Sequence, residues 1–498
     1  MGARLKLATP IHRQRSGNVR RYPLLFFGCL VFHTIGTWSL PLIDRDEPRF
    51  AEASREMIQR GDYVVPHFNN QLRLDKPPLA YWAQVASFKI LGESDFAARF
   101  PSAVAAALVA LSIFTWGNRF SDARVGWWAA IIFTLSLQTF LHAKAAVADM
   151  WLVLFMTVAH WAGYELIENR ESRIENRKRT WWWIFYLSLA LGFLAKGPIA
   201  WTPLLTIAFT MLFARDLSLA RRFKFIRGTV LMLGLIALWA APALLRTHGE
   251  FLTIGIGRHV IGRSFAAMES HGANSLGIYL LLLPFYFVTI FVSFFPWSVK
   301  LPLLVRRLWS ERDKIDNYLL AGAAIIFLIF TLVATKLPHY ILPAFPLLAL
   351  LLARRLIDQQ KFFTRAAIAA VCLYVVVAFV VPPLAARFFP VTQLYDAARD
   401  SLRPEMELGA ATFEEPSLVW YFRGRVNGWM SSLRPPSAME FMQRPGPRFL
   451  ILPTKLAQEH FPNSPRDWIT FSARGFNLAK GENVDLTLVL KQRDSLKH

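Results

Sequence analysis

Long apolar runs alternate with short polar connections over most of the chain before residue 387. A helix that crosses a bilayer needs roughly 20 mostly apolar residues. About eleven runs approach that length, some of them short, near 22–42, 99–117, 124–141, 150–167, 181–195, 198–214, 228–245, 275–300, 317–335, 341–353 and 366–386. This pattern predicts a polytopic α-helical membrane protein with about eleven or more transmembrane helices.

The basic residues predict how these helices are oriented, because lysine and arginine in short loops favour the cytoplasmic side. The tail 1–21 has six basic residues and no acid, so we expect it inside. The run that follows is too long for the core of a signal peptide and lacks a small-residue cleavage site, so we expect it to remain as an anchor. Clusters of bases recur in every second loop, near 119–124, 170–179, 215–227, 306–314 and 354–365. With the N-terminus inside, the segment 43–98 after the first span lies outside the cytoplasm, and an odd number of spans places the residues from 387 onward outside as well.

The C-terminal residues 387–498 differ from the membrane domain, 22–386, because they contain no long apolar run. Short strand-like pieces occur at SLVWYF (417–422), RFLILP (448–453) and DLTLVLKQ (485–492), with turn signals at Arg423-Gly424 and Lys480-Gly481. We therefore expect a small, soluble, extracytoplasmic α/β domain.

Composition agrees with a membrane protein, since 54% of the 498 residues are hydrophobic and 18% are charged. The net charge of +22 is explained largely by the basic loops, so it does not indicate a nucleic-acid partner. Cys29 and Cys372 both lie in apolar runs, which argues against a disulfide framework and a cysteine metal site.

The segment 43–98 is the longest extracytoplasmic loop of the membrane domain. Pro48 suits the first turn of a helix, an apolar face follows it, and Gly61 can end that helix. A second short helix begins at Pro77-Pro78 and runs to Gly92. Both are too short to span, so we expect two interfacial helices on the membrane surface.

The loop opens with DRDEPRFAE (44–52), a concentration of charge where the first span leaves the lipid. Asp46 and Glu47 precede a helix, where carboxylates are stabilised by the helix dipole, so they are either caps or functional acids. Lys76 lies near the start of the second helix, where a cation is disfavoured unless an anion joins it. It is either a phosphate ligand or a lysine that extends to the membrane interface.

Three further segments bring ionisable groups to the same face of the membrane. LHAKAAVADMW (141–151) contains Lys144 and Asp149, LAKGPIA (194–200) contains Lys196, and TKLPHYILP (335–343) contains Lys336, His339 and Tyr340. Charges at the ends of spans are costly enough to indicate function. Together with Asp46 and Lys76 they exceed what anchoring needs, and they predict one site.

Four segments carry a family resemblance, namely DEPRFAEASREMIQRGDYVVPHFNNQLRLDKPPLAYW (46–82), AKAAVADM (143–150), KGP (196–198) and KLPHYILP (336–343). They resemble, in the same order, the polyprenyl-phosphate-sugar glycosyltransferase superfamily of aminoarabinose transferases and protein O-mannosyltransferases, which has the GT-C fold. The resemblance implies transfer of a sugar from a polyprenyl (undecaprenyl) phosphate at the extracytoplasmic face.

The resemblance also implies roles for individual residues. Asp46 matches the essential acid of the family, Glu47 and Arg49 match its neighbours, and Asp149 matches the second acid. Lys76, in DKPP where EKP is usual, matches a ligand of the donor phosphate, and Lys144 stands where many members have arginine. His259 and Arg263, in RHVIGRSF, resemble an E-H-x-x-R-F segment, although Arg258 replaces its acid. The resulting assignment is catalytic for Asp46, Glu47 and Asp149, phosphate-binding for Arg49, Lys76, Lys144, Lys196, Arg263 and Lys336, and substrate-binding for His339 and Tyr340.

No cofactor is required by this assignment, but a divalent metal, zinc or magnesium, could be bound by Asp75 with His259, since a carboxylate and an imidazole are ordinary zinc ligands. A hydrogen-bonded pair is the alternative for these two residues. The oligomeric state is left open.

The predicted function is an inverting glycosyltransferase of the bacterial inner membrane with its active site on the periplasmic side. The acceptor that fits the resemblance best is lipid A or core lipopolysaccharide. A protein O-mannosyltransferase-like enzyme, a lipid or solute transporter, and a non-enzymatic envelope-assembly protein are the alternatives. A transporter would show paired internal repeats and discontinuous helices with charges near the midplane, and the sequence shows neither.

Overall fold

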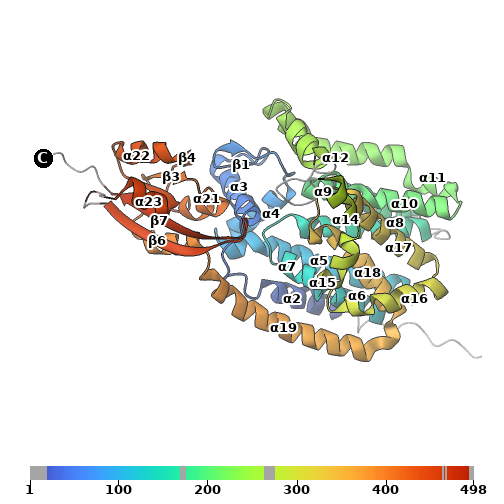
Figure 1. Ribbon diagram of the computed structural model, residues 1–498. Coiled ribbons are helices and arrows are strands. Elements are labelled where there is room, and N and C mark those ends of the chain that lie inside the picture. The colour runs from blue at the N-terminus through green and yellow to red at the C-terminus, as the bar shows by residue number, and fades with distance from the viewer. Residues whose placement is uncertain (1–19, 169–174, 263–274, 463–464, 466–467, 493–498) are drawn as a thin grey trace, which may run out of the picture.

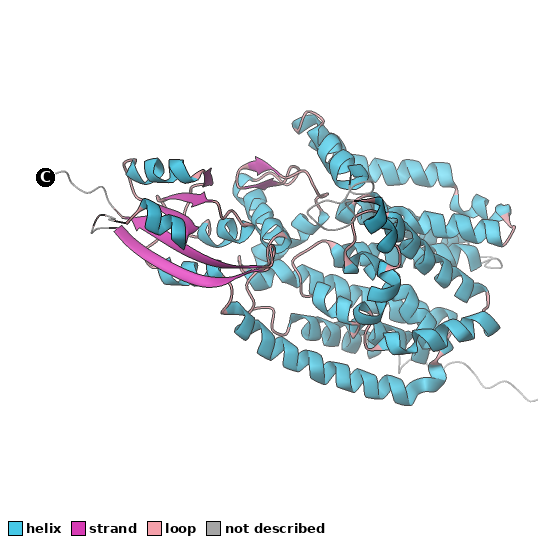
Figure 2. Cartoon of the chain, in the orientation of Figure 1, coloured by secondary structure: helices cyan, strands magenta, loops and turns pink. Residues whose placement is uncertain are grey.

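The computed structural model describes residues 20–168, 175–262, 275–462, 465 and 468–492. Figure 1 shows a large helical part, coloured blue to orange, and beside one end of it a smaller part that contains a sheet, coloured red. Figure 2 shows that the longer strands gather in this second part. The expected fold class, a helical membrane protein with a small C-terminal α/β domain, is confirmed, and the expected domain boundary near residue 387 stays a prediction.

The helical part is built from α-helices of very different length. They are α2 (Arg21–Thr34), α3 (Asp46–Arg60), α4 (Leu79–Leu91), α5 (Asp95–Phe120), α6 (Ala123–Thr134), α7 (Leu137–His142), α8 (Asp149–Glu168), α9 (Glu175–Lys196), α10 (Thr202–Phe213), α11 (Ala220–Phe223), α12 (Phe225–Arg246), α14 (Leu276–Leu281), α15 (Phe285–Ser293), α16 (Leu301–Glu311), α17 (Lys314–Leu332), α18 (Phe345–Arg355) and α19 (Gln360–Ala386). Short 3₁₀ turns at Pro198–Trp201, Leu217–Leu219, Trp297–Lys300, Pro338–Ala344 and Ile357–Gln359 and a π-helical segment at Phe251–Gly262 complete it.

Within the described residues, five helical segments are long and apolar enough to cross a membrane, and a sixth counts if Phe285–Ser293 and Trp297–Glu311, bent by 118°, form one span. The five are Asp95–Phe120, Asp149–Glu168, Ala220–Arg246, Lys314–Leu332 and Ile357–Ala386. The other apolar runs of the sequence form helices that are shorter, less apolar or interrupted. The chain is a multi-pass membrane protein, and the count of about eleven spans stays a prediction.

The interruption of the apolar run 22–42 has a clear cause. The helix α2 ends at Thr34, and Gly36 follows with φ +78°. A Cβ atom at Gly36 would lie 2.0 Å from the carbonyl oxygen of Ala378 on α19, so only glycine lets the two segments meet there. The run 22–42 is therefore a short helix followed by a tight turn.

Small residues pack the centre of the bundle, where α5 contacts α2, α6 and α8. A Cβ atom on Gly117 of α5 would lie 2.7 Å from the Cα atom of Gly126 on α6. Such close approach raises the van der Waals contact that holds helices together in lipid. Large buried aromatic side chains such as Trp116, Tyr186 and Trp297 fill the remaining space.

The loop 43–98 contains the two expected helices, α3 and α4, joined by a small hairpin of β1 (His67–Phe68) and β2 (Gln71–Leu72). Gly61 ends α3 in the left-handed conformation, as the sequence predicts. The helix α3 is more enclosed than a helix that lies on a bilayer would be, because α4 and α21 (Pro416–Phe422) both pack against it.

The C-terminal part has a mixed sheet in the order β4-β3-β5-β7-β6. Its strands are β3 (Glu407–Ala411), β4 (Met430–Leu433), β5 (Arg448–Pro453), β6 (Trp468–Asn477) and β7 (Glu482–Lys491), and its helices are α20 (Pro390–Ala398), α21, α22 (Pro435–Gln443) and α23 (Thr454–His460). β3 runs parallel to β4 and β5, and β7 runs antiparallel to β5 and β6. The strands predicted at 448–453 and 485–492 are confirmed. The strand predicted at 417–422 is wrong: Pro416 begins helix α21 there, and the apolar side chains pack inside the domain.

The C-terminal part is fastened to the loop 43–98 through α21. Ser417 donates two hydrogen bonds to Asp44, from its amide and its hydroxyl, and Trp420 and Tyr421 both donate to Asp95. Deeper in the contact, Arg423 binds the buried Glu52 of α3. The two regions that the sequence places outside the cytoplasm therefore lie on the same side of the bundle, as Figure 1 also shows.

Candidate active site

Two cavities meet where the helical bundle faces the loop 43–98. One is polar, with a volume of about 310 Å³, and the other is apolar, with a volume of about 940 Å³. They share six lining residues, namely Asp75, Lys76, Asp149, Lys196, His339 and Tyr340. Asp46, Arg49 and Arg73 line the polar cavity only, whereas Trp201, Trp239 and Phe330 help to line the apolar one. The combined space suits a molecule with a polar head and a long apolar tail.

Helix ends hold most of these charged groups in place. Asp46 begins α3, Asp149 begins α8, and Lys196 ends α9 just before Gly197, which has φ +85°. His339 and Tyr340 lie in the 3₁₀ turn Pro338–Ala344. Each polar residue therefore stands at the end of a helix or in a short turn between two helices, and the site forms at the level where the bundle meets the loop.

Asp46 and Glu47, which are neighbours in the sequence, have different environments. Glu47 is buried: its carboxylate is paired with Arg99 at 2.7 Å and accepts hydrogen bonds from the amides of Ile43 and Ala146. Asp46 is exposed to the polar cavity, and among the described residues its carboxylate makes no hydrogen bond or ion pair. The geometry assigns Glu47 to structure, against its predicted catalytic role, and leaves Asp46 available for chemistry.

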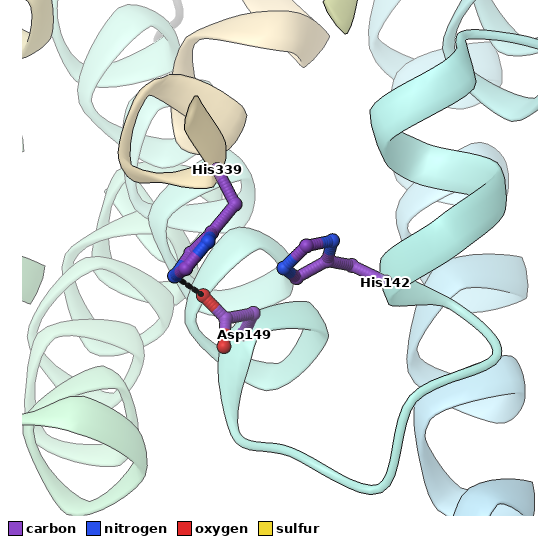
Figure 3. A group of neighbouring side chains, drawn as sticks. All are labelled: His142, Asp149 and His339. Carbon is purple, nitrogen blue, oxygen red and sulfur yellow. Dashed lines mark ion pairs between the residues drawn. The ribbon is translucent and has the colours of Figure 1, made fainter. Parts of the chain in front are cut away.

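Asp149 is the centre of a second cluster. Lys196 Nζ lies 2.6 Å from Asp149 Oδ1, and His339 Nε2 lies 4.0 Å from the same oxygen. Figure 3 shows His142 of α7 on the other side of Asp149, and the His142 and His339 rings are 4.6 Å apart between centroids. Burial lowers the pKa of both histidines, so both imidazoles are neutral at pH 7.

His142, Asp149 and His339 each offer a ligand atom within 4.8 Å of the others, so they could hold a divalent metal. His142 Nδ1 is hydrogen-bonded to the Gln138 amide, which leaves Nε2 for a ligand. The Lys196 ammonium already supplies a positive charge at Asp149. The metal site predicted at Asp75 and His259 is a different one, and the His259 side chain lies outside the described part of the chain.

Asp75 and Lys76 line both cavities. Lys76 Nζ lies 3.8 Å from Asp75 Oδ2, and Arg73 approaches the same oxygen at 3.2 Å. Arg73 also donates a hydrogen bond to the Tyr81 hydroxyl and is buried. Arg73 is not among the site residues predicted from the sequence, because a single arginine between Leu72 and Leu74 gives no signal of its own.

Two of the predicted phosphate ligands, Lys144 and Lys336, lie outside the polar and the apolar cavity. Lys144 Nζ donates to the carbonyl oxygens of Phe32, His33 and Ile35 at the end of α2, and it lines neither cavity. Lys336 Nζ donates to the carbonyl oxygens of Phe330 and Thr331 near the end of α17, and it also lines neither. Both lysines complement the negative end of a helix, which is a structural role. Arg263, the third, lies outside the described residues.

The site thus combines three features. Basic groups from Arg49, Lys76 and Lys196 surround a polar space, an unpaired carboxylate from Asp46 faces it, and an apolar cavity opens beside it. Cations positioned in this way can stabilise a phosphate as it departs, and a carboxylate can accept a proton or stabilise positive charge on a sugar.

Residues 75–240 match the family described as dolichyl-phosphate-mannose-protein mannosyltransferase. The chain is 32% identical over 344 residues to an undecaprenyl phosphate-alpha-4-amino-4-deoxy-L-arabinose arabinosyl transferase of Aeromonas hydrophila, covering 68% of this chain and 60% of that protein. A transferase of the same name from Pectobacterium carotovorum is 31% identical over 338 residues, covering 64% of this chain and 55% of that protein. The match thus spans less than two thirds of these relatives.

Two solved structures have the same architecture. ArnT from Cupriavidus metallidurans, bound to undecaprenyl phosphate, superposes with a TM-score of 0.76 at 17% identity, covering 95% of this chain and 98% of that chain. The archaeal oligosaccharyltransferase AglB from Archaeoglobus fulgidus, in complex with an inhibitory peptide and a dolichol-phosphate, superposes with a TM-score of 0.52 at 12% identity, covering 89% of this chain and 70% of that chain. At these identities the likeness shows the fold.

Proposed function

Because this chain has the GT-C fold and resembles the polyprenyl-phosphate-sugar glycosyltransferases in sequence, we propose that it is an integral-membrane glycosyltransferase. Its donor is a sugar carried on a polyprenyl phosphate, and undecaprenyl phosphate is the carrier named for its relatives. Its acceptor is an envelope lipid, lipid A or core lipopolysaccharide. The enzyme lies in the bacterial inner membrane with its site on the periplasmic side.

The main support for this proposal is that the polar and the apolar cavity adjoin and share lining residues. A polyprenyl-phosphate sugar has a sugar, a phosphate and a long hydrocarbon, in that order. The polar cavity accommodates the sugar, the apolar cavity accommodates the first isoprene units, and Lys76 and Lys196 lie where the two meet. The order of the chemical groups in the ligand thus matches the order of the surfaces in the protein.

The reaction breaks the bond between the anomeric carbon and the phosphate oxygen, and it forms a bond from that carbon to an acceptor oxygen. Arg49, Lys76 and Lys196 stabilise the departing polyprenyl phosphate. Asp46 orients an acceptor hydroxyl and takes its proton, or it stabilises positive charge on the sugar when the acceptor is already an anion. Attack opposite the leaving group inverts the anomeric carbon.

The match of residues 75–240 to a protein mannosyltransferase family supports a second candidate, in which the acceptor is a protein hydroxyl. The two functions use the same donor chemistry and differ in the acceptor. Purified protein in proteoliposomes, given an undecaprenyl-phosphate sugar together with either lipid A or a serine- and threonine-rich peptide, separates them. We expect labelled lipid A, and labelled peptide alone would favour the mannosyltransferase.

Replacement of Lys76 tests the donor site. We expect Lys76→Ala to weaken the binding of undecaprenyl phosphate by about tenfold to a hundredfold, because it removes a charged contact to the phosphate. Lys89→Ala is the matched control, since Lys89 lies on α4 of the same loop but outside both cavities. Binding is measured by titration of detergent-solubilised protein. Equal affinities of the two variants would remove Lys76 from the donor site.

The periplasmic side is tested by labelling. In a Cys372→Ser background we expect Gln71→Cys and Lys480→Cys to react with an impermeant maleimide in intact spheroplasts, because both are exposed in the regions that the charge pattern places outside. Ser310→Cys, which lies in the exposed last turn of α16 beside a basic loop, should react only after the membrane is opened. The reverse pattern would invert the topology.

A further inference from the structure

The C-terminal part contributes no side chain to the polar or the apolar cavity, within the part of the chain that the structure describes, because every lining residue lies before residue 344. It nevertheless packs against α3 through α21, and α3 begins with Asp46, the proposed catalytic carboxylate. Figure 1 shows the C-terminal sheet and its helices next to α3 and β1 at this end of the bundle. The C-terminal part can therefore affect the chemistry only through the elements that it contacts, above all the loop 43–98.

The helix α3 presents two separate rows of side chains. The first row, at a spacing of three and four residues, is Asp46, Arg49 and Phe50, and all three line the polar cavity. The second row has the same spacing and contacts the C-terminal part; it consists of Glu52, Arg55, Glu56 and Gln59. Successive residues of a helix are turned by about 100°, so the two rows face different sides. Because α3 is one continuous helix, the contacts of the second row also set the position of the first.

Arg423, which follows α21, makes the main polar contact to the second row. Glu52 and Glu56 lie one turn apart and are both fully buried, an arrangement in which two carboxylates repel each other unless a cation lies between them. The Arg423 guanidinium binds Glu52 and lies 3.4 Å from Glu56. It also donates a hydrogen bond of 3.0 Å to the Gln59 side chain, and the Trp429 ring covers it at 3.7 Å from centroid to Cζ. One side chain of the C-terminal part thus holds three positions of the second row.

The C-terminal part also holds the hairpin β1–β2. The Asn69 side chain exchanges two hydrogen bonds with the backbone of Met430 on β4, at 2.9 and 2.8 Å. Phe68 and Gln71 of the same hairpin line the polar cavity. Two walls of the polar cavity are therefore fixed from behind by a domain that does not enter it.

We propose that the C-terminal part is a positioning element for the active site, and that Arg423 is the positioning residue that holds α3 so that Asp46 faces the donor. The proposal rests on the proposed function and deepens it, because it gives the C-terminal part a role in the transfer. A carboxylate that takes a proton must lie within hydrogen-bond reach of it, and a displacement of about 1 Å can cost a hundredfold in rate. Lys76 and Lys196 lie outside α3, so the donor phosphate keeps these two contacts when α3 moves.

The test measures kcat for sugar transfer by purified, folded enzyme, below the unfolding temperature of every variant. We expect Arg423→Lys to lower kcat about tenfold, because lysine lacks the planar fork that contacts Glu52 and Gln59 at once. Lysine is chosen rather than an apolar residue because it keeps the buried charge and hence the fold. The Kd for undecaprenyl phosphate should rise less than about threefold. Arg425→Met is the matched control: Arg425 is exposed two residues later and donates to Tyr395 of the same part, so its kcat should stay at the wild-type value.

A second background separates loss of position from loss of stability. If Arg423 acts through Asp46, the effect of Arg423→Lys on kcat should shrink from about tenfold to less than about threefold in an Asp46→Asn enzyme, whose carboxylate no longer acts. A residue that only stabilises the fold would lower the rate by the same factor in both backgrounds.

Amide hydrogen exchange of the segment 46–60 gives a readout that needs no transfer. We expect exchange there to be about tenfold faster in Arg423→Lys than in the wild type, and unchanged in Arg425→Met. Faster exchange in an enzyme that transfers no sugar would support the placement of α3 by Arg423 and would count against the proposed function alone. A wild-type kcat in Arg423→Lys, an equal loss in both backgrounds, or unchanged exchange would each overturn the proposal.

Discussion

Asp46→Asn is expected to reduce sugar transfer about a thousandfold while undecaprenyl phosphate continues to bind. The substitution keeps the shape of the side chain and removes its charge and basicity. Asp46 makes no hydrogen bond or ion pair within the described residues, so the change breaks no contact that holds α3 in place. The donor phosphate is assigned to Lys76 and Lys196, which the substitution does not alter. The loss should therefore appear in kcat, as expected for a group that acts in the transition state.

The measurement is transfer from a labelled undecaprenyl-phosphate sugar to lipid A by purified variants of matched thermal stability. Glu93→Gln serves as the control, since Glu93 is a partly exposed carboxylate of the same loop that lines neither the polar nor the apolar cavity. Its turnover should equal that of the wild type. An Asp46→Asn enzyme with near-normal kcat would refute the assigned mechanism, and one that also lost donor binding would show that Asp46 contacts the donor in the ground state.

The position of Asp46 could be predicted from the sequence because it follows directly from where a long apolar run ends. The same reasoning located Asp149, Lys196 and His339, since each adjoins a break in an apolar helix. In these cases one local pattern contains both the helix end and the charged residue. The hydropathy of the chain thus predicts which groups stand at the membrane boundary.

The roles of Lys144 and Lys336 could not be predicted in this way. A sequence shows that a lysine lies near the end of a span, but it does not show whether the carbonyl groups of a neighbouring helix bind its ammonium group. In the fold both lysines bind such carbonyls. Burial, with a smaller contribution from the charge of Arg99, also lowers the pKa of Lys144 to about 7, which makes it a weaker phosphate ligand than a fully charged lysine.

The predicted length of the first helix and the predicted strand at 417–422 were wrong for a related reason. The helix α2 stops where Gly36 meets Ala378, a residue more than three hundred positions later, and the segment 417–422 forms a helix because its apolar side chains pack within the C-terminal domain. Both outcomes depend on contacts between segments that are remote in sequence. Apolar runs and strand propensity describe a segment by itself, so they could not reveal either contact.

Among these contacts between segments remote in sequence, the one made by Arg99 has the largest consequence for the structure around Asp46. It lies inside the span Asp95–Phe120 and is 2% exposed. Its guanidinium binds both carboxylate oxygens of Glu47 and the carbonyl oxygens of Thr37, Leu40 and Pro41. The whole turn between α2 and α3 is therefore folded around one side chain. Because Asp46 adjoins Glu47, this buried pair also fixes the position of the proposed catalytic carboxylate.

Arg99→Met should therefore destabilise the protein by about 3 to 5 kcal/mol, because it leaves the Glu47 carboxylate and three carbonyl groups buried without their partner. The comparison variant Arg444→Met breaks the ion pair with Glu440, in which the two side chains are 57% and 70% exposed, and should cost less than about 1 kcal/mol. Thermal unfolding in detergent, followed by tryptophan fluorescence, measures both.

The double variant Glu47→Gln with Arg99→Met should recover part of the loss, because the amide removes the uncompensated charge and leaves only polar groups unsatisfied. If Arg99→Met unfolded at the same temperature as Arg444→Met, Arg99 would not be the residue that holds the turn, and the position of Asp46 would need another explanation.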